Sequence, residues 1–135
     1  MIICFDIGGS AIKGALATSP SALTPLDRRP TPPEDFDAFV SVIAAMAGDG
    51  HTPIAIAITG VIDPVTGIIK CANIPCVDGT PLAAELTQRL NRPVLVANDA
   101  DCFALAEALE GAGRGHTIVF GAILGSGVGG GLVID

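Results

Sequence analysis

Short apolar runs alternate with longer helical patterns along this chain. Two β-rich runs, at 2–7 and 11–17, are separated only by the loop 8–10. They must pair as an antiparallel hairpin, because a parallel return needs a crossover of a dozen residues or more. A polar, proline-rich connector follows over about 18–33, and it is expected to hold a short third strand near 26–29.

Helical spacing of apolar residues predicts three helices. Thr31 and Glu34 have the spacing of a capping box, and apolar residues then recur at helical intervals over 36–47. A threonine–proline pair opens the second predicted helix, 80–91, because proline is favoured at the first helical position. The third helix is predicted over about 99–109, where it ends before a glycine-rich stretch.

The remaining apolar runs predict strands. Residues 53–60 and 94–96 are short and bounded by loop residues, as expected of buried strands, and 117–124 and 130–134 flank a glycine-rich loop. Opening hairpins followed by strand–helix alternation predict an α/β fold with a mixed sheet flanked by helices. The length predicts one domain, residues 1–135.

Composition and charge argue against two classes of partner, nucleic acids and membranes. Half of the residues are hydrophobic, and the net charge of −7 argues against a nucleic-acid partner, since phosphate backbones require clustered Lys and Arg. The uncharged stretch 117–134 is 18 residues long, the lower limit for a membrane span, but six of these residues are glycine. Glycine weakens a helix, so we expect two strands there and no membrane partner.

The cysteines indicate the compartment. Cys4, Cys71, Cys76 and Cys102 follow no CxxC spacing, and each lies in or beside an apolar segment. We therefore expect free, buried thiols rather than a metal site. The chain starts directly in a strand-like segment without the basic residues of a signal peptide, so a cytoplasmic location is expected.

The first candidate motif is the loop between the opening strands. Two glycines, Gly8 and Gly9, let the backbone turn tightly and bring its N–H groups close to an anion. Asp6 could hold Mg²⁺, the hydroxyl of Ser10 could donate to a phosphate oxygen, and Lys13 lies nearby. Taken alone, the same residues also fit an ordinary hairpin turn.

A second glycine-rich loop, 125–131, contains GxGxxG. That dinucleotide fingerprint requires a strand, a turn and then a helix. Here the glycines lead into another strand, so the dinucleotide interpretation fails. A hairpin whose loop amides face a phosphate remains open, and two glycine hairpins facing each other could hold one polyphosphate.

The third motif, Asn98-Asp99-Ala100-Asp101, lies between a strand and a helix. One Asp or Asn is expected there as an N-cap, but a carboxylate at the mouth of an α/β sheet is also where a general base would lie. Gly60 ends a strand and Asn73 lies in a loop. Turn chemistry accounts for both equally well.

Five segments, taken in order, resemble the ROK family of sugar kinases and repressors. They are FDIGGSAIKGAL, ITGVIDPVTG, ANIP, VANDADCFALAE and ILGSGVGGGLVID. They span nearly the whole chain, which is far more specific than one glycine motif. The resemblance implies the ribonuclease H-like fold of the actin/hexokinase ATPases. Three tracts, RRPTPPEDFDAF, CANIPCVDGTPLAAEL and NDADCFALAEA, look closest to the bacterial N-acetylglucosamine kinases of the family.

The resemblance implies a role for each matching residue. Asp99 would be the catalytic base that takes the proton from the sugar 6-hydroxyl, and Asp6 would lie near the Mg²⁺ that accompanies ATP. The ATP phosphates would be held by two loops, built from Gly8, Gly9, Ser10 and Lys13, and from Gly125, Ser126, Gly127, Gly129 and Gly130. The sugar hydroxyls would be contacted by Gly60, Asn73 and Asn98. The family usually has Thr then Lys at positions 10 and 11 and Thr at 126, and this chain departs from that pattern.

The implied activity is ATP-dependent phosphorylation of N-acetylglucosamine at O6. Alternatives within the family are an N-acetylmannosamine kinase, a glucokinase or a sugar-sensing regulator. A regulator would carry a DNA-binding domain before the hairpin that here starts at Ile2, so we expect a kinase. The family's kinases are longer, so residues 1–135 are expected to be the N-terminal domain, inactive alone and prone to form homo-oligomers. The structural zinc site of the family is expected only in the absent C-terminal half.

Overall fold

The computed structural model describes residues 1–125 and 128–135, which form two compact units. The N-terminal unit is Met1–Ala97 and the C-terminal unit is Asn98–Asp135. The prediction that residues 1–135 make one domain stays a prediction.

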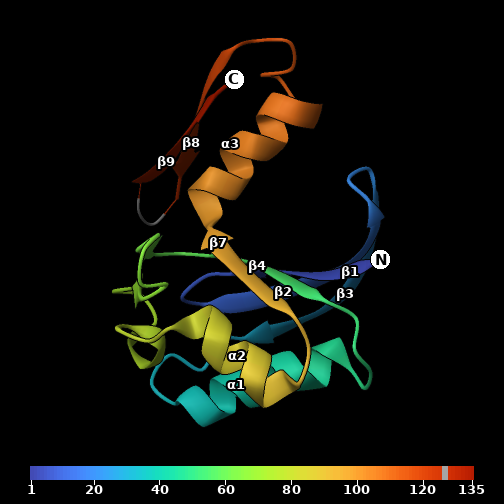
Figure 1. Cartoon of the computed structure of the whole chain (residues 1–135), viewed down its shortest axis with the longest axis vertical. Coiled ribbons are helices and arrows are strands. Elements are labelled where there is room, and N and C mark those ends of the chain that lie inside the picture. Colours follow the sequence, from blue (N-terminus) through green and yellow to red (C-terminus); the bar gives the residue numbers. More distant parts are fainter. Residues whose placement is uncertain (126–127) are drawn as a thin grey trace. The chain divides into compact units, whose positions relative to one another are not determined.

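A five-stranded mixed sheet forms the centre of the N-terminal unit (Figure 1). Its strand order is β3-β2-β1-β4-β7. The strand β1 pairs antiparallel with β2 and parallel with β4, which confirms both the opening hairpin and the mixed sheet. The strands are β1 (Ile2–Ile7), β2 (Ala11–Ser19), β3 (Ala22–Pro30), β4 (Ile54–Ile58) and β7 (Val94–Asn98).

The third strand is longer than predicted. It covers Ala22–Pro30 instead of 26–29, and it pairs antiparallel with β2. Almost all of its residues are exposed, so its sequence carries no apolar alternation to mark its ends. The backbone hydrogen bonds to β2, rather than burial of side chains, determine its length.

Alternating residues of the central strands face the helices. The isoleucines of β4 at positions 54, 56 and 58 are almost fully buried, and so are the corresponding residues of β1. They pack against α1 (Phe36–Ala47) and α2 (Leu82–Leu90), which lie on one side of the sheet (Figure 1). This period-two burial is the pattern expected of strands with one covered face.

The first helix covers Phe36–Ala47, the range that the apolar spacing predicted, but its N-cap lies four residues after Thr31, the cap position that the capping-box spacing indicated. Asp35 is the N-cap, and its carboxylate accepts a hydrogen bond of 2.9 Å from the Ala38 N–H. Thr31 and Glu34 therefore do not form the cap, because the Thr31 hydroxyl is bonded elsewhere. The helix ends as expected at Gly48, which adopts a positive φ of 66°.

A small hairpin follows β4. It consists of β5 (Val61–Ile62) and β6 (Ile69–Lys70), and a 3₁₀ turn, η1 (Pro75–Val77), comes next. The Asp63 carboxylate accepts hydrogen bonds of 2.8 Å from the N–H groups of Val65 and Thr66. These bonds to the charged form lower the pKa of Asp63.

The C-terminal unit is a helix packed on a two-stranded sheet. It consists of α3 (Asp99–Glu110), β8 (Ile118–Leu124) and β9 (Val128–Ile134), the two strands pairing antiparallel. The two strands predicted in the uncharged stretch are thus confirmed. No helix in the part of the chain that the structure describes is long and apolar enough to cross a membrane.

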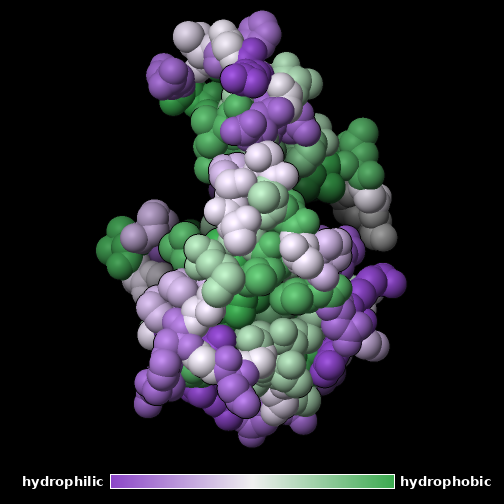
Figure 2. Space-filling model, turned by 90° about the vertical axis from the view of Figure 1, so that its right-hand side faces the viewer, coloured by the Kyte–Doolittle hydropathy of each residue, from purple (hydrophilic) through white to green (hydrophobic). Residues whose placement is uncertain are grey.

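The two faces of the β8–β9 hairpin differ. On the face against α3, a Cβ on Gly121 would lie 2.9 Å from the Ala104 Cα, so the helix and the strand approach closely only because this residue is glycine. The other face leaves large apolar side chains exposed, and hydrophobic residues gather on the surface of this unit in Figure 2. They are Ile118, Phe120, Leu124, Val128, Leu132 and Ile134.

The described cysteines are all free, as predicted. Only Cys71 is fully buried, whereas Cys4, Cys76 and Cys102 are half-buried. Burial raises the pKa of the thiols of Cys4, Cys76 and Cys102.

Candidate functional site

The first glycine loop connects β1 to β2 at the carboxyl end of β1. The Gly8 N–H donates to the Ala11 carbonyl at 3.0 Å, which closes a tight turn. Gly9 lies against Asn73, where a Cβ would be 3.1 Å from the Asn73 carbonyl oxygen and 3.3 Å from its Cβ. The structure therefore brings the predicted phosphate loop next to one of the predicted sugar contacts.

Asp6 and Lys13 face each other across the β1–β2 ladder. The Lys13 ammonium donates to the Asp6 carboxylate at 3.0 Å, and the two side chains are 60% and 56% exposed. An exposed pair of this kind contributes little to folding, roughly 0–1 kcal/mol. Either group can exchange its partner for Mg²⁺ or for a phosphate at small energetic cost.

Gly60 lies beside the same loop. It follows β4, where the Thr59 N–H donates to the Ile7 carbonyl at 3.1 Å and thus joins the ends of β1 and β4. The φ of Gly60 is +125°, and a Cβ there would lie 2.7 Å from the Lys70 carbonyl oxygen. The Cys71 thiol donates to the Thr59 carbonyl at 3.0 Å.

One residue near this loop was missed by the sequence reasoning. Thr31 is only 7% exposed, and its hydroxyl donates to the Gly8 carbonyl at 2.7 Å. Its N–H donates to the Ser10 carbonyl at 3.3 Å. The signal that reveals it is the β2–β3 register, in which Ala11 faces Pro30, so that the next residue of the chain reaches the loop.

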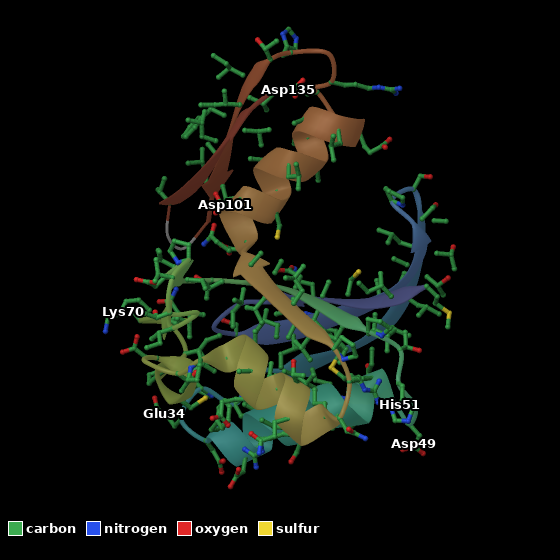
Figure 3. All side chains as sticks on the ribbon, viewed as in Figure 1. Glu34, Asp49, His51, Lys70, Asp101 and Asp135 are labelled. Carbon is green, nitrogen blue, oxygen red and sulfur yellow. The ribbon has the colours of Figure 1, made fainter. Side chains whose placement is uncertain are left out.

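In the C-terminal unit, the predicted base lies in the first turn of α3. Asn98 is the N-cap, and its side-chain oxygen accepts from the Asp101 N–H at 3.0 Å. Asp99 is half-buried, and its carboxylate accepts from the Ala100 N–H at 2.9 Å and from the Asn98 amide at 3.3 Å. Figure 3 labels Asp101, which is exposed.

The local charges bear on Cys102, which is half-buried on α3. Burial first, and then the negative charges of Asp101 and Asp99, raise the pKa of this thiol. Cys102 is therefore protonated at neutral pH and is no candidate nucleophile.

Part of the second glycine loop lies in a strand. Ser126 and Gly127 lie outside the described residues, and Gly125 precedes them. Gly129 and Gly130 belong to β9, which begins at Val128, two residues earlier than predicted. A Cβ on Gly129 would lie 3.5 Å from the Ala100 Cβ. Within this unit, the start of β9 is therefore beside the first turn of α3.

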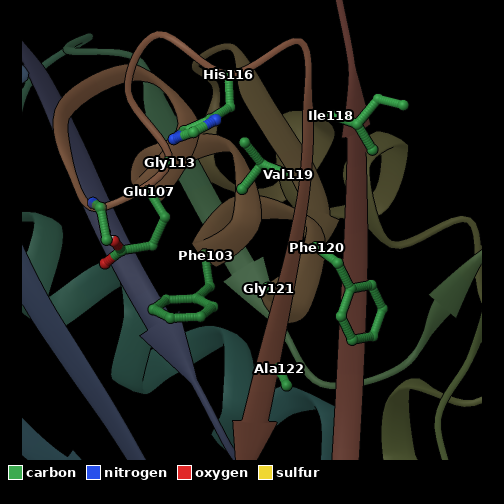
Figure 4. Close-up of a pocket in the computed structure, with 10 residues that line it drawn as sticks. Phe103, Glu107, Gly113, His116, Ile118, Val119, Phe120, Gly121 and Ala122 are labelled. Carbon is green, nitrogen blue, oxygen red and sulfur yellow. The ribbon is translucent and has the colours of Figure 1, made fainter.

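A separate hollow of ≈ 430 Å³ lies at the other end of α3 (Figure 4). Its walls are mainly apolar, and Glu107 and His116 also line it. Glu107 is half-buried and accepts a hydrogen bond of 2.8 Å from the Ala112 N–H. This bond helps to close the loop after α3, so the local role of Glu107 is structural.

The sequence of residues 2–135 matches the ROK family. The chain belongs to the ROK family. It is 41% identical, over 96% of its length, to the N-acetylgalactosamine kinase AgaK of Shewanella sp. strain ANA-3. It is 37% identical, over 97% of its length, to the N-acetyl-D-glucosamine kinase of Escherichia coli O127:H6. The matches cover only 44% and 45% of those proteins, so this ROK chain spans less than half the length of these relatives.

Solved structures of similar proteins have the same fold. A ROK family glucokinase from Streptomyces griseus, in complex with glucose and AMPPNP, matches 98% of the chain with a TM-score of 0.85 and 31% identity, over 44% of its own length. An inorganic polyphosphate/ATP-glucomannokinase from Arthrobacter sp. strain KM matches 99% of the chain with a TM-score of 0.84 and 32% identity, over 60% of its own length. These neighbours confirm the actin/hexokinase-like ATPase fold.

A ROK family transcriptional regulator, a homologue of the E. coli MLC protein, also matches, with a TM-score of 0.77 and 24% identity. At that identity the likeness shows the fold alone. Among the described residues, no group of three or more His, Cys, Asp or Glu side chains could hold a metal ion. The zinc site expected beyond this chain stays a prediction.

Proposed function

We propose that this chain carries the phosphate loops and the catalytic base of an ATP-dependent kinase that phosphorylates the 6-hydroxyl of N-acetylglucosamine. The observation that carries the proposal is the arrangement at the start of α3. There the Asp99 carboxylate is half-buried and is held by the Ala100 N–H and the Asn98 amide. A fixed, partly desolvated carboxylate is the group that a general base requires.

MgATP enters this reaction as a substrate. The Gly8–Ser10 loop offers backbone N–H groups and the Ser10 hydroxyl to its phosphates, and Asp6 offers a carboxylate to its Mg²⁺. These groups fit MgATP, because Asp6 is exposed and can exchange Lys13 for Mg²⁺. Lys13 is then able to bind a phosphate. The second loop, with Gly125, Ser126, Gly127, Gly129 and Gly130, is proposed to hold the same phosphates.

The sugar is the second substrate of the proposed reaction. Asn98, Gly60 and Asn73 contact its hydroxyls, and Asp99 accepts the proton of the 6-hydroxyl as the oxygen attacks the γ-phosphorus. The bond from that phosphorus to the ADP oxygen breaks. Phosphoryl transfer depends mainly on positioning and charge stabilisation, and a positioned base contributes about 10²–10⁴-fold.

Sugar identity is the finer part of the proposal. N-acetylglucosamine is favoured by the sequence tracts and by the kinases at 37% identity, whereas the Shewanella relative at 41% identity is an N-acetylgalactosamine kinase. N-acetylmannosamine kinase and glucokinase activities remain alternatives, and a sugar-sensing regulator is an alternative of another class. The chain is proposed to act in the cytoplasm, within a homo-oligomer, and to need the rest of a longer kinase, because a two-walled cleft excludes water.

The test is ATP-dependent turnover by the full-length gene product with each of these sugars. Asp99→Asn should abolish turnover and leave MgATP binding nearly unchanged, because the amide keeps the shape of the side chain but cannot take a proton. Asp101→Asn is the matched control, since it removes an exposed carboxylate from the same helical turn. Normal turnover in Asp99→Asn would overturn the proposed role of Asp99.

A further inference from the structure

A short segment after β3 joins the two loops that are proposed to bind phosphate and sugar. We call residues Thr31–Pro33 the strap. At one end, the Thr31 hydroxyl and N–H donate to the carbonyls of Gly8 and Ser10. At the other end, the Pro33 carbonyl accepts a hydrogen bond of 2.9 Å from the Cys76 N–H. The Cys76 thiol also donates to the Pro32 carbonyl, at 3.5 Å.

The strap contacts both the Gly8–Ser10 loop and the segment 73–76, and these two segments also contact each other. Cys76 comes three residues after Asn73, and Asn73 lies against Gly9. The phosphate loop is thus held from two directions, by Thr31 on its carbonyls and by the Asn73 backbone at Gly9. A shift of either loop has to break a hydrogen bond of the strap or open the contact at Gly9.

The hydrogen bond from Thr31 determines how one amide of the loop is turned. In a planar trans peptide the C=O and N–H groups point in opposite directions. The Gly8 carbonyl points to the Thr31 hydroxyl, so the Gly9 N–H of the same peptide unit points away from Thr31. A glycine-rich loop has no side chains that would otherwise keep this peptide from rotating.

We propose that Thr31 is a positioning residue, which orients the Gly8–Gly9 peptide so that the Gly9 N–H donates to a phosphate of MgATP. This role rests on the proposed function, because it requires the Gly8–Ser10 loop to bind phosphate. It adds to that function a residue that touches neither the nucleotide nor the sugar. The strap further couples the phosphate loop to Asn73.

The test compares three variants of the full-length gene product. Thr31→Val keeps the shape of the side chain but removes the hydroxyl, Thr31→Ser keeps the hydroxyl, and Thr24→Val is the control at an exposed threonine of β3. Kinetics gives the KM for MgATP and for the sugar. The NMR shift of the Gly9 amide on addition of MgATP reports binding without turnover.

Thr31→Val should raise the KM for MgATP about five- to tenfold, the loss expected for one hydrogen bond, without a matching change in the KM for the sugar. It should also reduce the Gly9 shift at a fixed MgATP concentration. Thr31→Ser and Thr24→Val should behave as the wild type. If Thr31→Val does not fold, Thr31→Ala is used instead, because it also lacks the hydroxyl and places a smaller apolar side chain against the loop.

The other possible outcomes decide separately on the role of Thr31 and on the proposed kinase function. If Thr31→Val only lowers thermal stability, or if Thr31→Ser loses MgATP affinity as Thr31→Val does, Thr31 is structural and the proposal is wrong, while the kinase function stands. If the wild type binds MgATP at Gly9 but phosphorylates no sugar, the proposed function fails and the role of Thr31 is still decided by binding. If the wild type binds no MgATP, both are overturned.

Discussion

Among the described glycines with a positive φ, Gly60 is the one at which replacement by alanine should destabilise the fold most. Gly60 has a φ of +125°, a conformation that L residues rarely adopt, and it follows β4 next to the proposed sugar contacts. A residue held in such a region costs of order 1–3 kcal/mol. The new Cβ would also lie 2.7 Å from the Lys70 carbonyl oxygen and 3.1 Å from the Cys71 Cβ.

The close contact adds a packing cost to the conformational cost. The Lys70 carbonyl belongs to the backbone of β6, which cannot turn aside as a flexible side chain could. Overpacking of this kind costs typically 1–3 kcal/mol. The sum predicts a loss of roughly 2–6 kcal/mol of unfolding free energy for Gly60→Ala.

Gly67→Ala is the matched control. Gly67 has a φ of +72°, and nothing lies within 4 Å of the position of a Cβ. This variant should therefore show only the conformational cost, about 1–2 kcal/mol. Urea unfolding followed by circular dichroism measures both variants against the wild type. A loss in Gly60→Ala no larger than that in Gly67→Ala would refute the claim that Gly60 is required by the approach of β6.

Two further predictions concern capping and pH. Asp35→Ala should lower the unfolding free energy by about 0.5–2 kcal/mol, because it removes the N-cap of α1. The control variant Asp49→Ala, at an exposed loop position, should change it little. Equal losses for the two variants in urea unfolding would contradict the capping role of Asp35. The folded-state pKa of Asp63 is lowered, chiefly by the Thr66 and Val65 N–H groups, so its contribution to stability is present above the unfolded pKa of about 3.9 and is lost as pH falls through the folded pKa. Wild type should accordingly exceed Asp63→Asn in stability at pH 6, and the difference should shrink toward pH 3; a difference independent of pH would show that the charge of Asp63 contributes nothing.

Local patterns predicted most of the elements. The hairpin of β1 and β2 and the helices α1 and α3 follow from alternation, from helical spacing and from a short glycine loop that leaves only one way to pair. These features act over a few residues. For the same reason, an Asp or Asn N-cap was predicted within residues 98–101, and the structure shows that it is Asn98.

Contacts between distant residues escaped the sequence. Thr31 and Glu34 have ideal capping-box spacing, but the Thr31 hydroxyl is bonded to Gly8, 23 positions away, and Asp35 caps the helix instead. Whether the Thr31 hydroxyl caps the helix or bonds to Gly8 depends on the β2–β3 register. That register contains irregularities between Lys13 and Ala15 and between Ala17 and Ser19, which no local pattern marks.

The glycines of the second loop show a related difficulty. Gly129 and Gly130 attracted a phosphate-binding interpretation because they lie in a glycine cluster. In the structure both belong to β9, and a Cβ on Gly130 would lie 2.7 Å from the Phe120 ring. Close packing within the C-terminal unit is thus a sufficient reason for a glycine at this position, whichever ligand the neighbouring loop binds.

The most direct measurement of the central claim is a crystal structure of the full-length gene product with N-acetylglucosamine and a magnesium-bound, non-hydrolysable ATP analogue. We predict that the Gly9 N–H and the loop before β9 contact the same phosphates, and that the Asp99 carboxylate lies within hydrogen-bond distance of the sugar 6-hydroxyl. A nucleotide bound away from the Gly8–Ser10 loop, or a 6-hydroxyl out of reach of Asp99, would contradict it.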